Sequence, residues 1–150
     1  MKKLLISSVL VGVLAMGGAS QEAPRSSGFV FEPDTPHKVM LVLQAGWSDE
    51  PEARAAVARY LYEHYRAEKL ELHQFQLGRE RNLAVLVIQP FDSAQEALTF
   101  REWMLERNPD FLQMGITAWT AVISDENFLR LAQEPRLDAY RRFFRQHFLD

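Results

Sequence analysis

Two short stretches of the chain, residues 39–43 and 83–88, contain no polar position. Each is rich in Val, Leu or Ile and lies close to a glycine or proline, which is typical of a strand buried on both faces. Residues 70–77 and 116–123 are partly polar, which predicts strands with one more accessible side. Within 70–77 the apolar positions change face beside His73, which predicts a β-bulge there.

Helical periodicity separates and follows these predicted strands. Apolar residues at helical spacing predict a first helix over residues 49–66. A second helix is predicted between Ser93, which opens a capping box, and Asn108, which stands before a proline. A short helix over residues 126–132 is followed by a last helix that begins at Pro135 and carries an aromatic stripe.

The order of these elements, β-α-β-β-α-β, predicts an α+β domain of the ferredoxin-like class with two additional C-terminal helices. That class has the strand order 4-1-3-2, which places the first and third strands in the centre of the sheet. These are the two stretches without a polar position. The hydrophobic pattern and the connectivity therefore predict the same arrangement.

The chain begins with features of an export signal. Lys2 and Lys3 precede the apolar run 4–16, and small residues follow it, so residues 1–19 are predicted to be a cleavable signal peptide. The run is shorter than the roughly 20 residues that span a bilayer. In the alternative, the signal stays uncleaved and holds the domain at the inner membrane. Residues 20–35, rich in Pro, Ser and Gly, are predicted to be a flexible linker, and 36–150 a single domain.

Composition narrows the classes of function. The formal net charge is −3, and cleavage of the signal removes two of the 17 basic residues and none of the 20 acidic ones, giving −5. An acidic protein of this kind is not expected to bind nucleic acid. The chain has no cysteine, which excludes disulfides, thiolate metal sites and a cysteine nucleophile. We expect an exported protein, periplasmic or secreted, without a transmembrane helix in its mature form.

Few residues are candidates for chemistry. The four histidines lack the spacing of metal ligands, so neither a metal site nor a cofactor is predicted. Ser124 follows a strand and precedes a helix, but the glycines of a nucleophile elbow are absent, so helix capping is the better interpretation. Trp103 and Trp119 are expected in the core, whereas Trp47, after the first strand, fits loop packing and a contact surface equally well. No catalytic residue is predicted.

Several short elements together resemble a known family. They are Pro36-His37, Phe91-Asp92-Ser93-Ala94, Ile123-Ser124-Asp125-Glu126-Asn127-Phe128 and Tyr140-Arg141-Arg142-Phe143-Phe144. Residues 30–150 resemble the C-terminal domain of the PorW/SprE family, the tetratricopeptide-repeat lipoproteins of type IX secretion and gliding motility. The chain departs from that family because it lacks the repeats and the lipobox cysteine. The resemblance does not imply a lipid anchor.

The resemblance implies a non-enzymatic interaction or scaffolding module of the cell envelope, with envelope proteins as partners. His37, Trp47, Ser124, Asn127 and Phe128 are the signature or interaction residues that we single out. We hypothesise that Asn127 bonds the loop that begins at His37. The alternative function is peptidoglycan binding on an open sheet face, as in SPOR domains of the same architecture. A small hydrolase is the third and least supported class.

Overall fold

The computed structural model describes residues 28–44 and 50–149. Its elements, in chain order, are β1 (His37–Leu43), α1 (Glu50–Tyr65), the 3₁₀ turn η1 (Arg66–Glu68), β2 (Glu71–Leu77), β3 (Leu83–Phe91), α2 (Ala94–Arg107), α3 (Asp110–Gln113), β4 (Thr117–Ser124), α4 (Asp125–Gln133) and α5 (Leu137–Phe148). The fold is α+β, as predicted. The turn η1 and the short helix α3 were not predicted from the sequence.

The four strands form one antiparallel sheet in the order β2-β3-β1-β4. Read from the β4 edge, the same order is 4-1-3-2, so β1 and β3 occupy the centre. The centre requires apolar side chains on both faces of the strand. Residues 39–42 and 85–88 meet that requirement, since each is at most 3% exposed.

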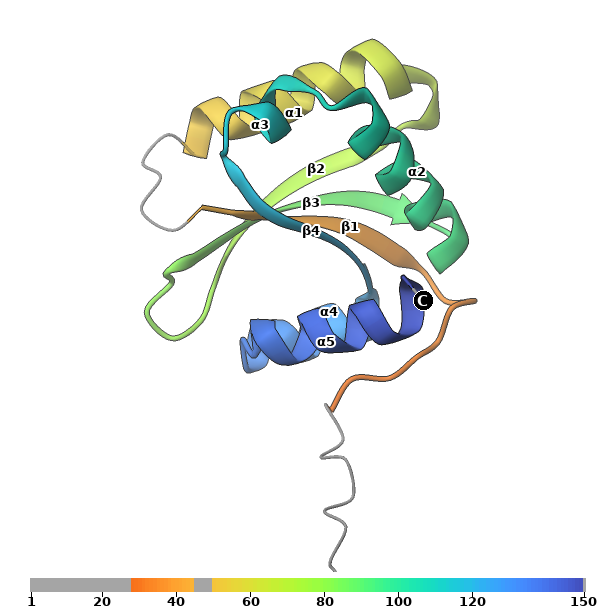
Figure 1. Cartoon of the computed structure of the whole chain (residues 1–150), viewed down its shortest axis with the longest axis vertical. Helices are drawn as coiled ribbons and strands as arrows, with labels where there is room; N and C mark the ends of the chain where they lie inside the picture. Colours follow the sequence, from red (N-terminus) through yellow and green to blue (C-terminus); the bar gives the residue numbers. More distant parts are fainter. Residues whose placement is uncertain (1–27, 45–49, 150) are drawn as a thin grey trace, which may run out of the picture.

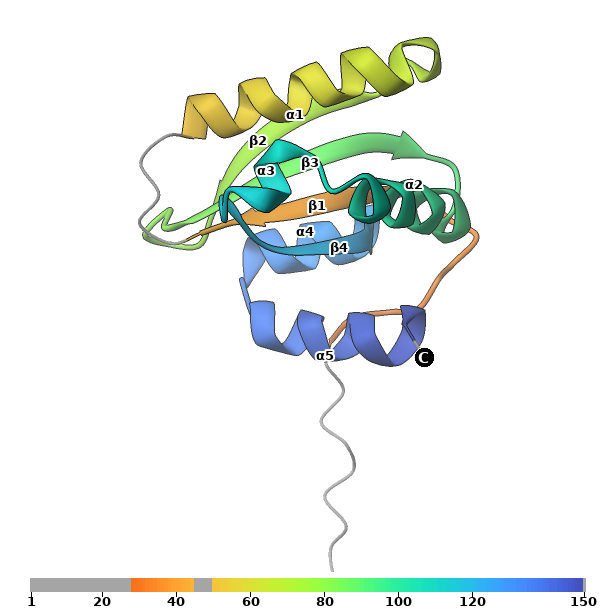
Figure 2. The ribbon, with the colours of Figure 1, turned by 45° about the horizontal axis from the view of Figure 1, so that its top comes forward.

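Helices cover both faces of this sheet (Figures 1 and 2). Helices α1, α2 and α3 lie on one face, and α4 and α5 lie on the other. Side-chain contacts agree with this layering. On the first face, Gln74 and Gln76 of β2 donate hydrogen bonds to Glu50 of α1, at 2.7 and 2.8 Å. On the second face, Trp119 of β4 packs against Phe144 of α5 with ring centroids 5.9 Å apart.

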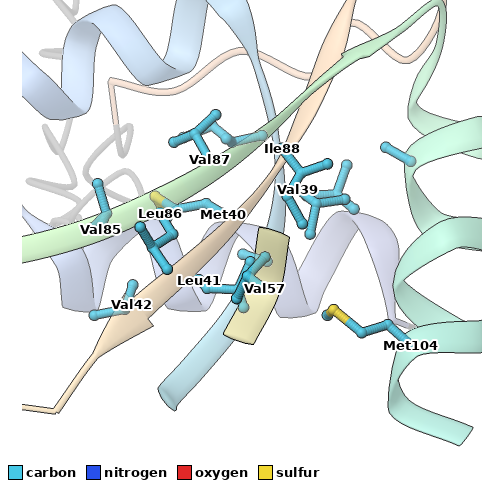
Figure 3. Packing of buried hydrophobic residues seen from close by; sticks show 14 of the residues in the cluster. Val39, Met40, Leu41, Val42, Val57, Val85, Leu86, Val87, Ile88 and Met104 are labelled. Carbon is cyan, nitrogen blue, oxygen red and sulfur yellow. The ribbon is translucent and has the colours of Figure 1, made fainter. Parts of the chain in front are cut away.

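The core lies on both sides of the central strand pair (Figure 3). The register places Val39 opposite Ile88 and Met40 opposite Val87, so the two apolar stretches face each other residue by residue. Val57 of α1 and Met104 of α2 belong to the same buried cluster. Burial of each such side chain contributes roughly 1.5–3 kcal/mol to the free energy of unfolding.

The predicted bulge beside His73 is wrong. β2 pairs with β3 in a regular register from Glu71 to Leu77. The apolar positions change face because helices cover both faces of the sheet, so a regular strand presents Leu72 to α1 and Phe75 to α4. The register shifts lie instead in β1, between His37 and Val39 against β3 and between Val42 and Leu43 against β4.

The boundaries of α2 follow the local sequence. The Ser93 hydroxyl accepts a hydrogen bond from the Glu96 amide at 3.3 Å, and the Glu96 carboxylate accepts one from the Asp92 amide at 3.0 Å. This is the reciprocal arrangement of a capping box, shifted by one residue. The helix ends at Asn108, which adopts a left-handed conformation with φ of 45°. No helix in the described ranges is long and apolar enough to cross a membrane.

Candidate functional site

Four of the five residues singled out in the sequence meet where β1 begins and α4 starts. His37 opens β1 directly opposite Ser124, the last residue of β4. Asn127 and Phe128 follow in the first turn of α4. All four side chains are buried. Trp47 lies outside the described residues.

His37 is only 1% exposed, and its Nδ1–H donates a hydrogen bond of 2.6 Å to the Thr35 carbonyl. Its ring also contacts Phe148 of α5 edge-on. Burial lowers the pKa of His37 below 6.5 because desolvation outweighs the Thr35 hydrogen bond and the charge of Asp125, which both favour the cation. The side chain is therefore a neutral structural donor at neutral pH.

Ser124 caps α4, as the sequence predicts, since its hydroxyl accepts a hydrogen bond from the Asn127 amide at 3.1 Å. The Asn127 side chain makes two further bonds, and both go to Val30. Its Oδ1 accepts from the Val30 amide at 2.9 Å, and its Nδ2 donates to the Val30 carbonyl at 2.7 Å. The hypothesis that Asn127 bonds the loop beginning at His37 is therefore wrong, because the partner lies seven residues earlier.

These bonds hold residues 28–35, which we call the N-terminal strap, against the C-terminal helices. Phe29 packs edge-on against Tyr140 at 4.9 Å, and Phe31 stacks on His147 at 4.9 Å. Arg130 donates to the Gly28 carbonyl, and the Pro33 carbonyl accepts from the Ala94 amide at 2.8 Å. Residues 28–35 are therefore not the flexible linker that was predicted for this part of the chain. Their apolar side chains dock because α5 offers them an aromatic surface.

The Lys38 ammonium group also contacts this junction. Lys38 Nζ lies 2.9 Å from the Asp125 carboxylate and donates to Gln89 Oε1 at 2.8 Å. It also sits over the Phe128 ring, 5.5 Å from the centroid. The side chains of His37, Lys38, Ser124 and Asn127 thus each bond to a partner within the fold. The junction accordingly joins strap, sheet and helices, and it leaves its serine and histidine without access to solvent.

No group of three or more His, Cys, Asp or Glu side chains in the described parts of the chain could hold a metal ion. The sheet likewise offers no open face there, because α4 and α5 cover the side opposite α1 and α2 (Figure 2). Accessible binding surface must therefore be sought on the helices, at the sheet edges or between these elements.

A cleft of about 520 Å³ opens between α2 and the C-terminal end of α1. Its apolar wall includes the buried rings of Tyr65, Phe91 and Phe100. Trp103, which we expected in the core, lies on its rim and is 49% exposed. We call this feature the Trp103 cleft.

Helical geometry explains the position of Trp103. The buried stripe of α2 is formed by Ala94, Ala97, Phe100 and Met104. At 100° per residue, position 103 falls roughly 110° from the centre of that stripe, on the flank of the helix. The sequence signal was therefore present, because a tryptophan off the apolar stripe of an amphipathic helix is a candidate for surface contact.

The rim of the cleft is acidic. The carboxylates of Glu68, Asp92 and Glu96 line it, and no Lys or Arg side chain from the described residues does. Gln95 and Thr99 add neutral hydrogen-bonding groups along α2. The cleft therefore combines aromatic surface with negative charge, a combination that suits a cation with an apolar stem.

Arg107 holds one ring of the apolar wall in place. Its guanidinium donates to the hydroxyls of Tyr60 and Tyr65, at 3.2 and 3.0 Å, and lies over the Tyr65 ring. Burial raises the pKa of Tyr65 to about 12, so the phenol stays neutral and bonded to Arg107. The Tyr65 ring is thereby fixed in orientation.

No family model, curated protein or solved structure matches this chain.

Proposed function

We propose that this chain is an exported, non-enzymatic protein-interaction module that binds a partner at the Trp103 cleft. The observation that carries the proposal is the exposure of Trp103 beside an apolar wall. A large aromatic side chain at a concave site is a common anchor of protein interfaces. Single exposed apolar residues such as Met114 and Leu129 are ordinary, whereas Trp103 borders the apolar wall of a cleft, and that combination is what singles it out.

The finer fold class is part of the proposal. We infer a ferredoxin-like domain extended by α4 and α5. The antiparallel sheet order supports it, as do α1 and α2, which lie on one face of the sheet. The two additional helices then occupy the face that such domains leave open, and they hold the N-terminal strap in place.

The cell envelope is the proposed location. The support is the sequence pattern of residues 1–19, which predicts export to the periplasm or beyond. The resemblance to the PorW/SprE family suggests a scaffolding role in type IX secretion. An N-terminal sequence of the mature protein that begins near Ser20 is the expected result. A mature protein that retains residues 1–19 would favour an uncleaved anchor.

A non-enzymatic role agrees with how the polar groups are used. Ser124 is bonded as a helix cap, and His37 is bonded to the Thr35 carbonyl. Both side chains are at least 98% buried, so a substrate could not reach them without local unfolding.

Peptidoglycan binding is the alternative. On a sheet face it would require an open face, and α4 and α5 cover the one that the ferredoxin-like arrangement leaves free. The Trp103 cleft is the remaining place where a sugar could stack. Retention of the purified protein on sacculi, lost in Trp103→Ala, is the result that would replace the protein-partner proposal with this one.

The test is affinity purification of the exported protein after chemical crosslinking in cells. We compare the unchanged chain with Trp103→Ala and with Leu129→Ala. Leu129, on α4, is the matched control because it is 59% exposed and lies outside the cleft. We expect discrete partners to be retained by Leu129→Ala and lost by Trp103→Ala. Partners that survive Trp103→Ala unchanged would contradict the proposed site.

A further inference from the structure

The Trp103 cleft has a distinct chemical character beyond its exposed tryptophan. Tyr65, Phe91 and Phe100 provide a buried aromatic wall, and Trp103 together with the exposed Pro90 extends it to the surface. A long aliphatic chain could lie along this surface. Such a cleft discriminates poorly among apolar ligands by itself, so charge must decide which ligand fits.

The charge at the cleft has one sign. Glu68 is contributed by η1, Asp92 follows β3, and Glu96 lies in the first turn of α2. Asp92 and Glu96 lie together at the start of α2, where the Asp92 amide donates to the Glu96 carboxylate, and Glu68 comes from a separate segment, so two parts of the chain supply the carboxylates. Lys and Arg side chains are absent from its lining in the described part of the molecule. The complementary ligand group is a cation.

The fold already shows the same chemistry at one ring of the wall. There the Arg107 guanidinium lies over the Tyr65 ring, 5.5 Å from its centroid, and donates to the Tyr65 hydroxyl. The α2 side of the cleft presents a second, larger ring, that of Trp103. Tryptophan attracts cations more strongly than tyrosine does, because its ring system carries more negative charge on its face.

The surroundings favour a side chain on a peptide over a free small cation. A second groove, of about 280 Å³, runs between α1 and the start of β2 and shares Tyr65 and Leu70 with the cleft. Arg66 and Lys69 line this groove, so a basic side chain of a bound segment is favoured in the acidic cleft and not in the groove. β2 is an edge strand of the sheet. An extended segment lying in this groove would reach the cleft with a side chain, as peptides that dock beside edge strands do.

We propose that the Trp103 cleft binds the side chain of an arginine or lysine in an extended segment of the partner protein. The aliphatic stem packs against the aromatic wall, and the charged head lies among Glu68, Asp92 and Glu96. This inference rests on the proposed function, because it assigns the chemistry of the partner at the same cleft.

The test is an NMR titration of the full mature chain with short peptides blocked at both ends. The probe peptide has one arginine between glycines, and its counterpart has citrulline, which is neutral and nearly isosteric. The indole N–H signal of Trp103 is assigned as the one that disappears from the spectrum of Trp103→Phe. We expect the arginine peptide to shift this signal. The citrulline peptide should bind about tenfold more weakly, because it cannot make the cation–π contact or the charge-assisted hydrogen bonds.

Charge variants test the acidic rim. The double variant Glu68→Gln with Asp92→Asn should weaken the arginine peptide by a similar factor. Glu63→Gln with Glu80→Gln is the matched control, because both residues are exposed carboxylates outside the cleft. The control should bind the peptide as the unchanged chain does. The Trp119 indole signal, from a half-buried position, reports that each variant is folded.

Three results would overturn the inference: no shift of the Trp103 signal, equal binding of the citrulline peptide, or a shift caused instead by an N-acetylglucosamine tetramer. Failure of the peptide titration is distinguishable from failure of the proposed function. If partners still depend on Trp103 in crosslinked cells while the arginine peptide does not bind, the interaction site stands and the basic side chain is wrong. If neither depends on Trp103, both proposals fall.

Discussion

At the scale of single residues, the burial of the polar side chains of His37, Ser124 and Asn127 is explained by their hydrogen-bond partners. The sequence singled out Asn127 and His37, and the structure buries both. It could not reveal that Asn127 reaches Val30, because that contact joins residues 97 positions apart. Trp103 shows the opposite case. Its position off the apolar stripe was readable, but whether neighbouring helices cover that flank depends on tertiary packing.

Substitution of Asn127 tests the link between the strap and α4. Asn127→Ala removes both hydrogen bonds to Val30 and leaves the backbone amide and carbonyl of Val30 without these partners. We expect a loss of about 1–3 kcal/mol in the free energy of unfolding, measured by urea denaturation. Asn82→Ala, at an exposed position between β2 and β3, is the control and should lose much less. Equal stability of both variants would show that the strap bonds contribute nothing.

The lowered pKa of His37 predicts a pH dependence of stability. Between its folded-state pKa and 6.5, the unfolded chain binds a proton that the folded chain does not. The stability that His37 contributes is therefore fully present above pH 6.5 and is lost as the pH falls below it. In His37→Asn, which keeps a donor but cannot titrate, the melting temperature should vary less between pH 7 and 5. His64→Gln, at an exposed position, is the control for loss of a histidine. An unchanged slope in His37→Asn would contradict this assignment.

At the scale of elements, the central strands and the helix caps could be predicted, and the N-terminal strap could not. Residues 39–43 and 83–88 are apolar throughout, so their place in the centre follows from burial alone. The strap has the composition of a linker, yet Phe29 and Phe31 dock on α5. The prediction of a bulge in β2 was wrong for a related reason. The sequence of a single strand does not reveal that helices cover both faces of the sheet.

Truncation tests the strap as an element. A chain that begins at Gly28 keeps every strap contact described above, whereas a chain that begins at Pro36 loses those of Phe29, Val30 and Phe31. We expect the second chain to be less stable than the first by about 3 kcal/mol or more, because two aromatic rings and several hydrogen bonds are lost. Thermal unfolding of the two chains measures the difference. Equal melting temperatures would mean that the strap packs on the helices without stabilising them.

At the scale of the whole molecule, the two layers of helices have different uses in this account. The layer of α4 and α5 closes one sheet face and secures the strap, so its aromatic residues are largely occupied by internal contacts. The layer of α1 and α2 leaves the Trp103 cleft between its helices. The sequence indicated an interaction module without locating its surface, because the cleft joins residues of η1, β3 and α2 that only the fold brings together.

Site-specific photocrosslinking tests the central claim, that a partner binds at the Trp103 cleft, most directly. A photoreactive phenylalanine analogue replaces either Gln95, an exposed residue of the cleft lining, or Leu129, and Trp103 stays in place. Cells are irradiated before extraction. The account predicts a discrete crosslinked adduct from position 95 and none from position 129. Adducts from both positions alike, or from position 129 alone, would contradict it.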